Sequence, residues 1–552
     1  MPIRLLALLP LFLLSALLGA AAQTINAVSC NSSDVQTAVN KATEGQTVTI
    51  PPCPSGVTWS SGVTVSGKGI NIQGSGSGRI IAYDNGTETP AIGTGTQTFT
   101  LAGFSPGFNA SSITNGEILR VFEDNNQGNY MQGTVTSFNT DTNVLTMNIT
   151  STGGSGSTHR WLVSTLPSTV LVDNSSSFMF SLTEDTSFHT SVSGIQLQAG
   201  TNTSSAILFL YNSGGVPILI HDNWFQLTSN AEMIDSTTNR GVIWHNSFSA
   251  STGNSGQLNT TAAVRIKGAP GTSWTTPSTW GAADTSGTGA VYVETNDFHV
   301  LQSAADNDDN GRMVWRYNLM DHAEYGTHGA DTSNYGQRYF EYYKNTGVFY
   351  PYSDGSTFNV PNGWIGLVRG GTYVVWGNTL PAMVSQDFGT KSDILMIVMN
   401  LQRNAGPDPC WGANPSSGGE YYHAPRQVGF GYVTGSGTAN YSADGVKNAS
   451  TDSISYVGDS EPAYIWNNSR EPLTNVTTED YGSGNTNGCS GSTDTTANYV
   501  VSGRDYFNGS TARKYFRFEP GADLVKVQWN QLKAPTPVCY SFLFPLGGYP
   551  GM

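Results

Sequence analysis

The segment Val291-Tyr-Val-Glu-Thr-Asn296-Asp-Phe decides the fold, because its pattern of apolar-x-apolar-x-x-Asn-x-apolar recurs along the chain. The other instances are Ile218-Leu-Ile-His-Asp-Asn223-Trp-Phe, Val242-Ile-Trp-His-Asn246-Ser-Phe, Val314-Trp-Arg-Tyr-Asn318-Leu-Met, Phe340-Glu-Tyr-Tyr-Lys-Asn345-Thr and Val374-Val-Trp-Gly-Asn378-Thr-Leu. Successive Asn positions are separated by 23, 50, 22, 27 and 33 residues. A period of 22–23 residues, with doublings and loop insertions, is typical of one turn of a parallel β-helix.

The recurring Asn has a physical role in such a solenoid. A bend residue that tolerates the left-handed conformation can stack on its counterpart one turn away and share amide hydrogen bonds with it. We therefore expect all six Asn residues to occupy comparable bends and to form a ladder.

The N-terminus predicts export. Met1–Ala22 carries Arg4, an apolar run from Leu5 to Leu18, and then small residues, which is the pattern of a secretory signal peptide. The apolar run, about 14 residues, is shorter than the ~18 to 20 needed to cross a bilayer. We expect a mature chain that starts near Gln23, lies outside the cytoplasm (extracellular or periplasmic) and has no membrane span.

The mature chain opens with one predicted helix and then short strands. Val35, Ala38, Val39 and Ala42 have helical spacing after a cap at Ser33 or Asp34, and the helix is expected to end near Gly45. The alternating runs Val48-Thr-Ile50, Val63-Thr-Val65 and Ile70-Asn-Ile72 follow as first turns of the solenoid. A helix laid over the first turn would cover an open strand edge. This opening resembles the pectate-lyase-like superfamily, which implies an all-β, right-handed parallel β-helix with an N-terminal capping helix.

The spacing of the short apolar runs divides the rest of the chain into segments. We predict a cap with first turns over residues 23–86, a β-rich insertion over 87–165, a central β-helix with the active groove over 166–394, and last turns with a loop-rich cap over 395–552. Within the insertion, Met131–Phe138 and Val144–Ile149 predict a hairpin.

Composition limits the partners. Charged residues make up 12% of the chain, against a typical ~25%, and the formal net charge is −15. An acidic chain disfavours nucleic acid and anionic membrane surfaces. We expect a monomer whose partner is a polysaccharide.

Five cysteines are compatible with disulfides in an exported chain. Cys30 and Cys53 flank the predicted helix and the strand after it, so we pair them as a clip on the N-terminal end. Cys410 with Cys489 is the second expected pair, which leaves Cys539 unpaired.

Ionisable residues concentrate between Asp306 and Arg369. From this window we take Asp308, Asp309, His328, Glu341 and Arg338 as candidate catalytic residues, and Arg316, His322, Glu324, Asp331, Lys344 and Arg369 as candidate substrate-binding residues. We expect Asp308, Asp309, His328 and Glu341 to converge on one cleft, because they belong to neighbouring turns. The alternative is a long solvated loop between two strand edges.

Asp308-Asp309 followed by His328-Gly329 resembles the polygalacturonase family, in which paired aspartates work beside a His-Gly motif. Thr295-Asn296-Asp297 resembles that family's Asn-x-Asp element. The resemblance implies hydrolysis by paired carboxylates that hold a water between them.

Other interpretations of the window stay open. Asp306-x-Asp308-x-Asn310-Gly311 matches the first half of a calcium loop, but Tyr317 stands at position twelve, so this is not an EF-hand; no cofactor is required, and a single Ca²⁺ is an alternative. A lyase would instead need a base, such as His322, His328 or Tyr335, and a cation such as Arg312 or Arg316.

Two tryptophans complete the candidate set. Trp274 and Trp280 lie in a Gly/Pro/Thr-rich insertion, where an exposed ring suits stacking on a sugar; they would equally serve to cover the turn beneath. The sequence thus favours a secreted carbohydrate-active enzyme, with hydrolysis slightly ahead of β-elimination on a uronic-acid glycan. A non-catalytic surface or adhesion β-helix is the competing class.

Overall fold

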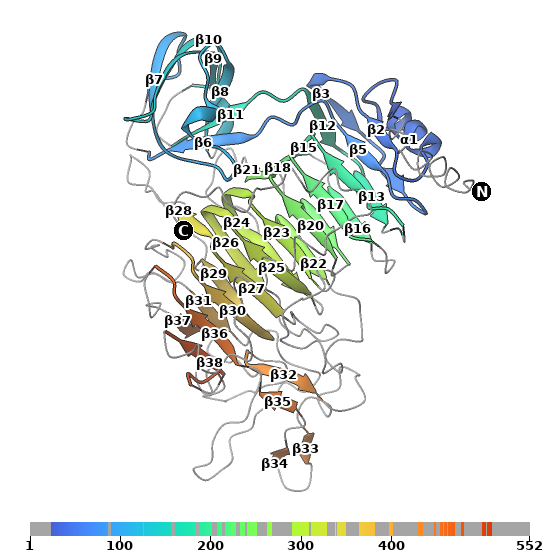
Figure 1. Cartoon of the computed structure of the whole chain (residues 1–552), viewed down its shortest axis with the longest axis vertical. Helices are drawn as coiled ribbons and strands as arrows, with labels where there is room; N and C mark the ends of the chain where they lie inside the picture. Colours follow the sequence, from blue (N-terminus) through green and yellow to red (C-terminus); the bar gives the residue numbers. More distant parts are fainter. Residues whose placement is uncertain are drawn as a thin grey trace, which may run out of the picture.

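The computed structural model shows an all-β chain in which parallel strands stack into a right-handed β-helix (Figure 1). It describes residues 24–86, 90–124, 126–155, 160–183, 185, 187–200, 207–211, 216–227, 232–237, 240–250, 262–267, 290–308, 311–327, 337, 339–348, 364–380, 397–400, 428–433, 446–448, 453–455, 458–460, 462–469, 476–479, 500–503 and 505–509. The predicted solenoid is confirmed.

One side of the solenoid is a twelve-stranded parallel sheet, called sheet 1 here. In spatial order it contains β1 (Thr24–Asn26), β2 (Thr47–Thr49), β5 (Asn71–Gln73), β14 (Ser191–Ser193), β17 (Ile218–His221), β20 (Gly241–Trp244), β23 (Val291–Glu294), β25 (Arg312–Arg316), β27 (Tyr339–Tyr343), β30 (Thr372–Trp376), β36 (Ala463–Trp466) and β38 (Tyr506–Asn508).

A sixteen-stranded sheet bends to form the two other sides. Face 2a contains β3 (Cys53–Trp59), β12 (Thr169–Asp173), β15 (Gln196–Ala199), β18 (Trp224–Leu227), β21 (Ser247–Ala250), the first halves of β24 (Asp297–Asp308) and β26 (Leu319–Thr327), and β28 (Thr346–Val348). Face 2b contains β4 (Val63–Val65), β13 (Phe180–Thr183), β16 (Leu208–Tyr211), β19 (Ile234–Ser236), β22 (Val264–Lys267), the second halves of β24 and β26, β29 (Ile365–Val368), β31 (Ile397–Asn400) and β37 (Val476–Glu479).

Each coil runs from sheet 1 to face 2a and then to face 2b. Alternate side chains of every strand point into the centre, where one apolar core runs through the coils. Phe225, Phe248, Phe298 and Trp315 stack there with ring centroids 4.6–4.8 Å apart. The alternation also sends every second side chain outward, so each face carries in-register columns of residues.

The predicted Asn ladder is confirmed and extends further. Asn223, Asn246, Asn296, Asn318, Asn345 and Asn378 are buried, and the side-chain oxygen of each from Asn246 onward accepts hydrogen bonds from the Asn one coil earlier. Asn468 continues the ladder by accepting two bonds from Asn378.

The left-handed residue of the bend is not the Asn itself. Positive φ angles of 51–63° fall on the residue before it, namely Asp222, His245, Thr295, Tyr317, Lys344, Gly377 and Asn467. The Asn backbone remains outside the positive-φ region. Its side-chain amide forms hydrogen bonds with the Asn of the next coil. Our assignment of the left-handed conformation to Asn was therefore wrong by one residue.

The N-terminal cap contains α1 (Ser32–Lys41). The helix starts earlier than predicted, with Asn31 as its N-cap, because the Asp34 carboxylate accepts a hydrogen bond from Ser29 Oγ at 2.6 Å instead of capping the helix. The Gln36 side chain accepts a hydrogen bond from the backbone N–H of Thr64 at 2.8 Å and donates one to its C=O at 3.1 Å. The helix therefore supplies hydrogen-bond partners to the edge strand β4 of face 2b. Cys30 and Cys53 form the predicted disulfide, with Cα atoms 6.6 Å apart.

The β-rich insertion is a closed antiparallel barrel with its own apolar core (Figure 1). Its strands are β6 (Ile80–Asp84), β7 (Gly95–Phe104), β8 (Ile118–Glu123), β9 (Asn126–Asn139), β10 (Val144–Gly153) and β11 (Trp161–Thr165), with a 3₁₀ turn η1 at Ala110–Ser112. β9 and β10 confirm the predicted hairpin. The barrel interrupts the solenoid between β5 and β12 and lies beside the first coils.

Two short antiparallel pairs follow the main coils: β32 (Phe430–Val433) with β35 (Gly458–Ser460), and β33 (Val446–Asn448) with β34 (Ser453–Ser455). Cys410, Cys489 and Cys539 lie outside the described residues. No helix among the residues described is long and apolar enough to cross a bilayer.

Candidate functional site

A column of polar and aromatic side chains runs along the outer surface of sheet 1. In exact β-register, the last residues of successive strands are His221, Trp244, Glu294, Arg316, Tyr343, Trp376 and Trp466. Their neighbours Val293, Trp315 and Tyr342 belong to the interior core, so the column points outward. We call these seven residues the strip.

Most members of the strip contact the next one. His221 stacks on Trp244 with centroids 4.2 Å apart, Tyr343 stacks on Trp376 at 5.0 Å, and the Trp376 and Trp466 centroids are 6.2 Å apart. Six coil steps of ~4.8 Å give the strip a length of roughly 30 Å. Because these stacked rings cover one another's faces, they leave their edges for contact with an extended ligand such as a chain of sugar units.

Charge lies at the centre of the strip. Arg316 Nε donates to Glu294 Oε2 at 2.5 Å, and Arg316 Nη1 donates to the Tyr343 hydroxyl at 3.0 Å. The guanidinium also lies 5.4 Å from the Tyr292 ring centroid. Burial raises the pKa of the Tyr343 hydroxyl, and the nearby Arg316 charge only partly offsets this, so the phenol stays protonated near neutral pH.

Glu341 occupies a second outward column of sheet 1. From β17 to β36 the other members of this column are Leu219, Val242, Tyr292, Val314, Val374 and Tyr464, so Glu341 is the one carboxylate among these described residues. Tyr339 donates a hydrogen bond to Glu341 Oε1 at 2.9 Å. Burial raises the pKa of Tyr339 well above its ordinary value, and the Glu341 charge adds to that shift. A carboxylate held by a phenol in apolar surroundings is a candidate for proton-transfer chemistry.

The strip is not uniformly accessible. Five strip residues are buried, namely Trp244, Glu294, Arg316, Tyr343 and Trp466, and so is Glu341 of the second column; the His221 side chain is 23% exposed and its neighbour Asp222 is 49% exposed. Tyr317, Lys344 and Trp376 are half-buried beside the buried centre.

The structure brings three predicted site residues together on sheet 1: Glu341, Arg316 and Lys344. Lys344 is the bend residue after Tyr343, and its Nζ lies 5.3 Å from the Trp376 ring centroid. The strip residues Glu294, Tyr343 and Trp376 were missed by the sequence analysis.

Asp308 is placed elsewhere, so the expected convergence of Asp308 and Glu341 was wrong. Asp308 lies on face 2b, where its carboxylate pairs with Arg265 Nη2 at 2.7 Å; Asp306 faces the same guanidinium at 3.4 Å. The physical reason is that β24 continues past the bend onto face 2b, where it pairs with β22 and sets Asp306 opposite Arg265 and Asp308 opposite Lys267. Among the described residues no group of three or more His, Cys, Asp or Glu side chains is arranged to hold a metal ion. The Ca²⁺ alternative stays a prediction.

Other predicted residues are also dispersed. The Glu324 carboxylate lies against Gly366 on face 2b, and Arg369 lies in the bend after β29, where its backbone N–H donates to Thr327 Oγ1 at 3.2 Å. Asp309, His328, Asp331, Arg338, Trp274 and Trp280 lie outside the described residues.

His322 belongs to a buried ionic network that joins the barrel to face 2a. Arg160 of the barrel bonds both oxygens of Asp321 at 2.6 Å, and His322 Nδ1 lies 2.7 Å from Asp321 Oδ1. His299 lies between Asp321 and Asp297, at 2.8 and 2.9 Å. Arg79 Nη2 completes the network 3.3 Å from Asp297. Asp297, the aspartate of the Asn-x-Asp element, therefore helps to hold the barrel against face 2a.

The pKa values of two residues in this network are shifted. Burial alone would lower the pKa of His299, but its hydrogen bonds to Asp297 and Asp321 prevail and raise the pKa to about 9. Burial alone would raise the pKa of Asp321, but the Arg160 charge holds it well below its ordinary value. At neutral pH the network thus contains charged partners on both sides of the interface.

Comparisons with known proteins give the following. No family model matches the chain, and no curated protein matches it in sequence. Among solved structures, the tailspike gp61 of Pseudomonas phage phi297 is 10% identical over 66% of this chain and 75% of its own, with a TM-score of 0.14. The tailspike protein gp49 of Pseudomonas phage LKA1 is 10% identical over 64% and 74%, with a TM-score of 0.13. TM-scores this low support no inference about function.

Proposed function

We propose that this protein is a secreted enzyme that binds a polysaccharide along the strip and cleaves its glycosidic bonds at the centre of sheet 1. The single observation that supports this is the in-register strip itself, in which stacked rings flank the Glu294, Arg316 and Tyr343 cluster. The rings supply apolar contacts to sugars, and charged groups supply hydrogen bonds and proton transfer.

Hydrolysis is the favoured chemistry. We assign Glu341, in its apolar column, the role of proton donor to the glycosidic oxygen. Glu294 is ion-paired with Arg316, and we assign it the role of base that takes a proton from the attacking water. The half-buried Tyr317, Lys344 and Trp376 lie beside this centre and would make the first contacts with the glycan.

The second candidate is β-elimination on a uronic-acid glycan. Arg316 beside the Tyr343 hydroxyl favours it, because a guanidinium can neutralise a uronate carboxylate while a phenol handles the proton. The raised pKa of Tyr343, caused by burial, counts against this phenol as a base. Hydrolysis is therefore favoured over β-elimination.

A panel of acidic and neutral polysaccharides, incubated with the purified mature chain, tests the proposal. New reducing ends without ultraviolet-absorbing unsaturated products support hydrolysis. Unsaturated products support the lyase. Retention of a polysaccharide without any product would mean that the protein is a non-catalytic binding β-helix, and the enzymatic proposal would be abandoned.

A further inference from the structure

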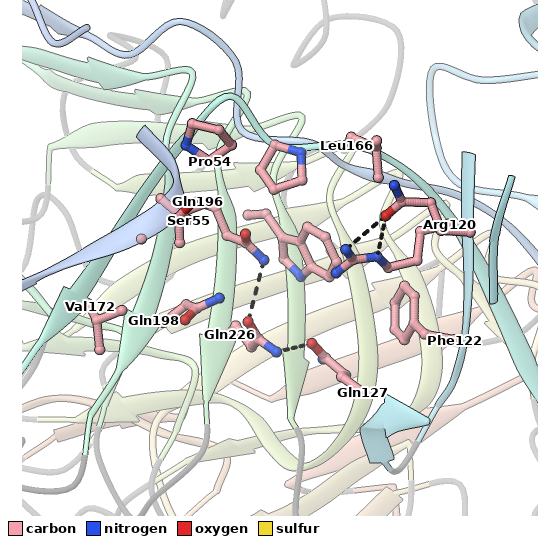
Figure 2. A pocket seen from close by; sticks show the side chains of 15 residues that line it. Pro54, Ser55, Arg120, Phe122, Gln127, Leu166, Val172, Gln196, Gln198 and Gln226 are labelled. Atoms are coloured by element: carbon pink, nitrogen blue, oxygen red, sulfur yellow. Dashed lines mark hydrogen bonds between the residues drawn. The ribbon is translucent and has the colours of Figure 1, made fainter. Parts of the chain in front are cut away.

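A cavity of about 330 Å³ lies between the barrel and the first coils of the solenoid (Figure 2). Face 2a forms its floor, with Gln196 and Gln198 of β15 and Trp224 and Gln226 of β18. Arg120, Phe122 and Gln127 of the barrel form one wall. The volume is at the lower end of the ~300 to 1,000 Å³ typical of small-molecule sites.

The cavity exists because the barrel covers only part of face 2a. Two outward columns of this face continue from Gln196 and Gln198 through Trp224 and Gln226 to Ser247 and Ser249, and then to Asp297 and His299. The barrel anchors on the later coils through Arg79 and Arg160. Ahead of this contact a cavity remains over the amide-bearing coils, where Gln198 and Gln226 are half-buried while Gln196 and Trp224 are buried.

The floor and wall are tied together by amide hydrogen bonds. Gln196 Nε2 donates to Gln226 Oε1 at 3.3 Å, and the Gln226 side chain donates in turn to Gln127 Oε1 of the barrel. Gln127 Nε2 donates to Ser249 Oγ at 2.8 Å. Figure 2 shows this chain of amides across the cavity. The lining is thus a fixed set of groups that both donate and accept.

A buried aromatic pair and a hydrogen-bonded cation complete the lining. The Phe122 and Trp224 rings have centroids 5.5 Å apart. Arg120 donates from Nε and Nη2 to Gln132 Oε1, at 3.2 and 2.8 Å, and its guanidinium lies 4.5 Å from the Tyr130 ring centroid. Among the described residues that line this cavity, none carries a carboxylate.

We propose that this cavity is a second carbohydrate site, which binds one or two uncharged sugar units of a neutral glycan. Each sugar hydroxyl both donates and accepts a hydrogen bond, as the amides of Gln198 and Gln226 do. Pro54, Leu166, Pro167 and Val172, which are exposed or half-buried, supply the apolar surface for a sugar. The Gln198 side chain makes no hydrogen bond within the described part of the chain, so its amide is available to the ligand. The inference goes beyond the proposed function, because this site would bind glycan whether or not sheet 1 cleaves it.

Titration calorimetry of the mature chain tests the site, with cellohexaose, mannohexaose, maltohexaose, xylohexaose and the charged hexagalacturonate as probes. At least one neutral hexasaccharide should bind. Gln198→Ala should weaken that binding about fivefold, the loss of one net hydrogen bond. Ser55→Trp should weaken it at least as much, because Ser55 is exposed at the cavity rim and a large ring there obstructs entry.

The matched control is Gln97→Ala on β7 of the barrel, a half-buried glutamine outside the cavity, which should leave the affinity unchanged. The proposal is overturned if no neutral hexasaccharide binds, if only hexagalacturonate binds, or if Gln198→Ala and Ser55→Trp both bind like the unaltered chain. If a polysaccharide is cleaved but both variants bind the hexasaccharide like the unaltered chain, the cavity site is contradicted and the proposed function is still supported. If binding depends on Gln198 but no polysaccharide is cleaved, the cavity site is supported and the proposed function is contradicted.

Discussion

Asn318 Oδ1 accepts two hydrogen bonds from Asn296 one coil earlier, from the backbone N–H at 3.0 Å and from the side-chain amide at 3.2 Å. Asn318 in turn donates its side-chain amide to Val293 O and to Asn345 Oδ1, at 2.9 and 3.2 Å. One side chain therefore links three coils. Every member of the ladder is buried, so a missing amide leaves partners that water does not reach.

Asn318→Ala should lower the free energy of unfolding by about 1–3 kcal/mol, because the amides of Asn296 lose a buried acceptor. Chemical denaturation measures the change. Asn148→Ala, at an exposed position of β10, is the control and should be near neutral. Equal stability of the two variants would count against the ladder as a stabilising element.

Removal of the Cys30–Cys53 disulfide should destabilise the N-terminal cap. The bond closes a loop with a sequence separation of 23 residues, and the chain-entropy model assigns such a loop about 3 kcal/mol. The double variant Cys30→Ser/Cys53→Ser should therefore unfold at lower denaturant than the oxidised chain. Treatment of the unaltered chain with a reductant should reproduce the loss, and it should leave the double variant unchanged.

The barrel interface should make stability depend on alkaline pH through His299. Its pKa, about 9 in the folded chain, exceeds the ~6.5 of an unfolded histidine, so the folded state binds the proton more tightly. The stabilisation is fully present below pH ~6.5 and is lost as pH rises through 9; its size is on the order of 3 kcal/mol. His299→Gln should flatten this part of the stability profile.

The control for that experiment is His221→Gln, which alters a partly exposed histidine on sheet 1. It should keep the alkaline loss of stability. If His299→Gln shows the same slope as the unaltered chain, the Asp297, His299 and Asp321 contacts do not govern the titration.

The strip predicts a role for aromatic stacking in polysaccharide affinity. Trp376 is half-buried and lies between Tyr343 and Trp466. Trp376→Ala should weaken binding of the polysaccharide found in the panel about tenfold, through the loss of a half-buried ring whose edge contacts a sugar. Tyr211→Ala removes an exposed ring from face 2b and should have no effect. Affinity electrophoresis compares the two, and equal mobility shifts would contradict the strip.

The fold could be predicted because each coil repeats its pattern locally. Two apolar residues that point inward and one buried Asn recur in successive turns from Asn223 to Asn378, and these suffice to identify a β-helix. The barrel was anticipated only as a β-rich insertion, since its closure depends on pairings between strands far apart in sequence, such as β6 with β11.

The site was only partly predictable. All seven strip residues stand two positions before a ladder Asn, so their outward column is implicit in the repeat; Arg316 was chosen because it is charged, and the aromatic members were overlooked. Asp308 and Glu341 were expected to converge because their segments belong to neighbouring turns. Which face each occupies depends on where the chain bends, and the charge-rich pattern alone does not specify that.

The most direct test of the account compares Glu341→Gln with Asp308→Asn on the polysaccharide that the panel identifies. Gln retains an oxygen that can accept the Tyr339 hydroxyl, so folding should be preserved and circular dichroism should confirm it. Glu341→Gln should reduce turnover about a hundredfold or more, because a proton-transfer group is lost. Asp308→Asn, which alters an ion pair on face 2b, should retain near-normal turnover. Near-normal turnover in Glu341→Gln, or a comparable loss in Asp308→Asn alone, would contradict a catalytic centre on sheet 1.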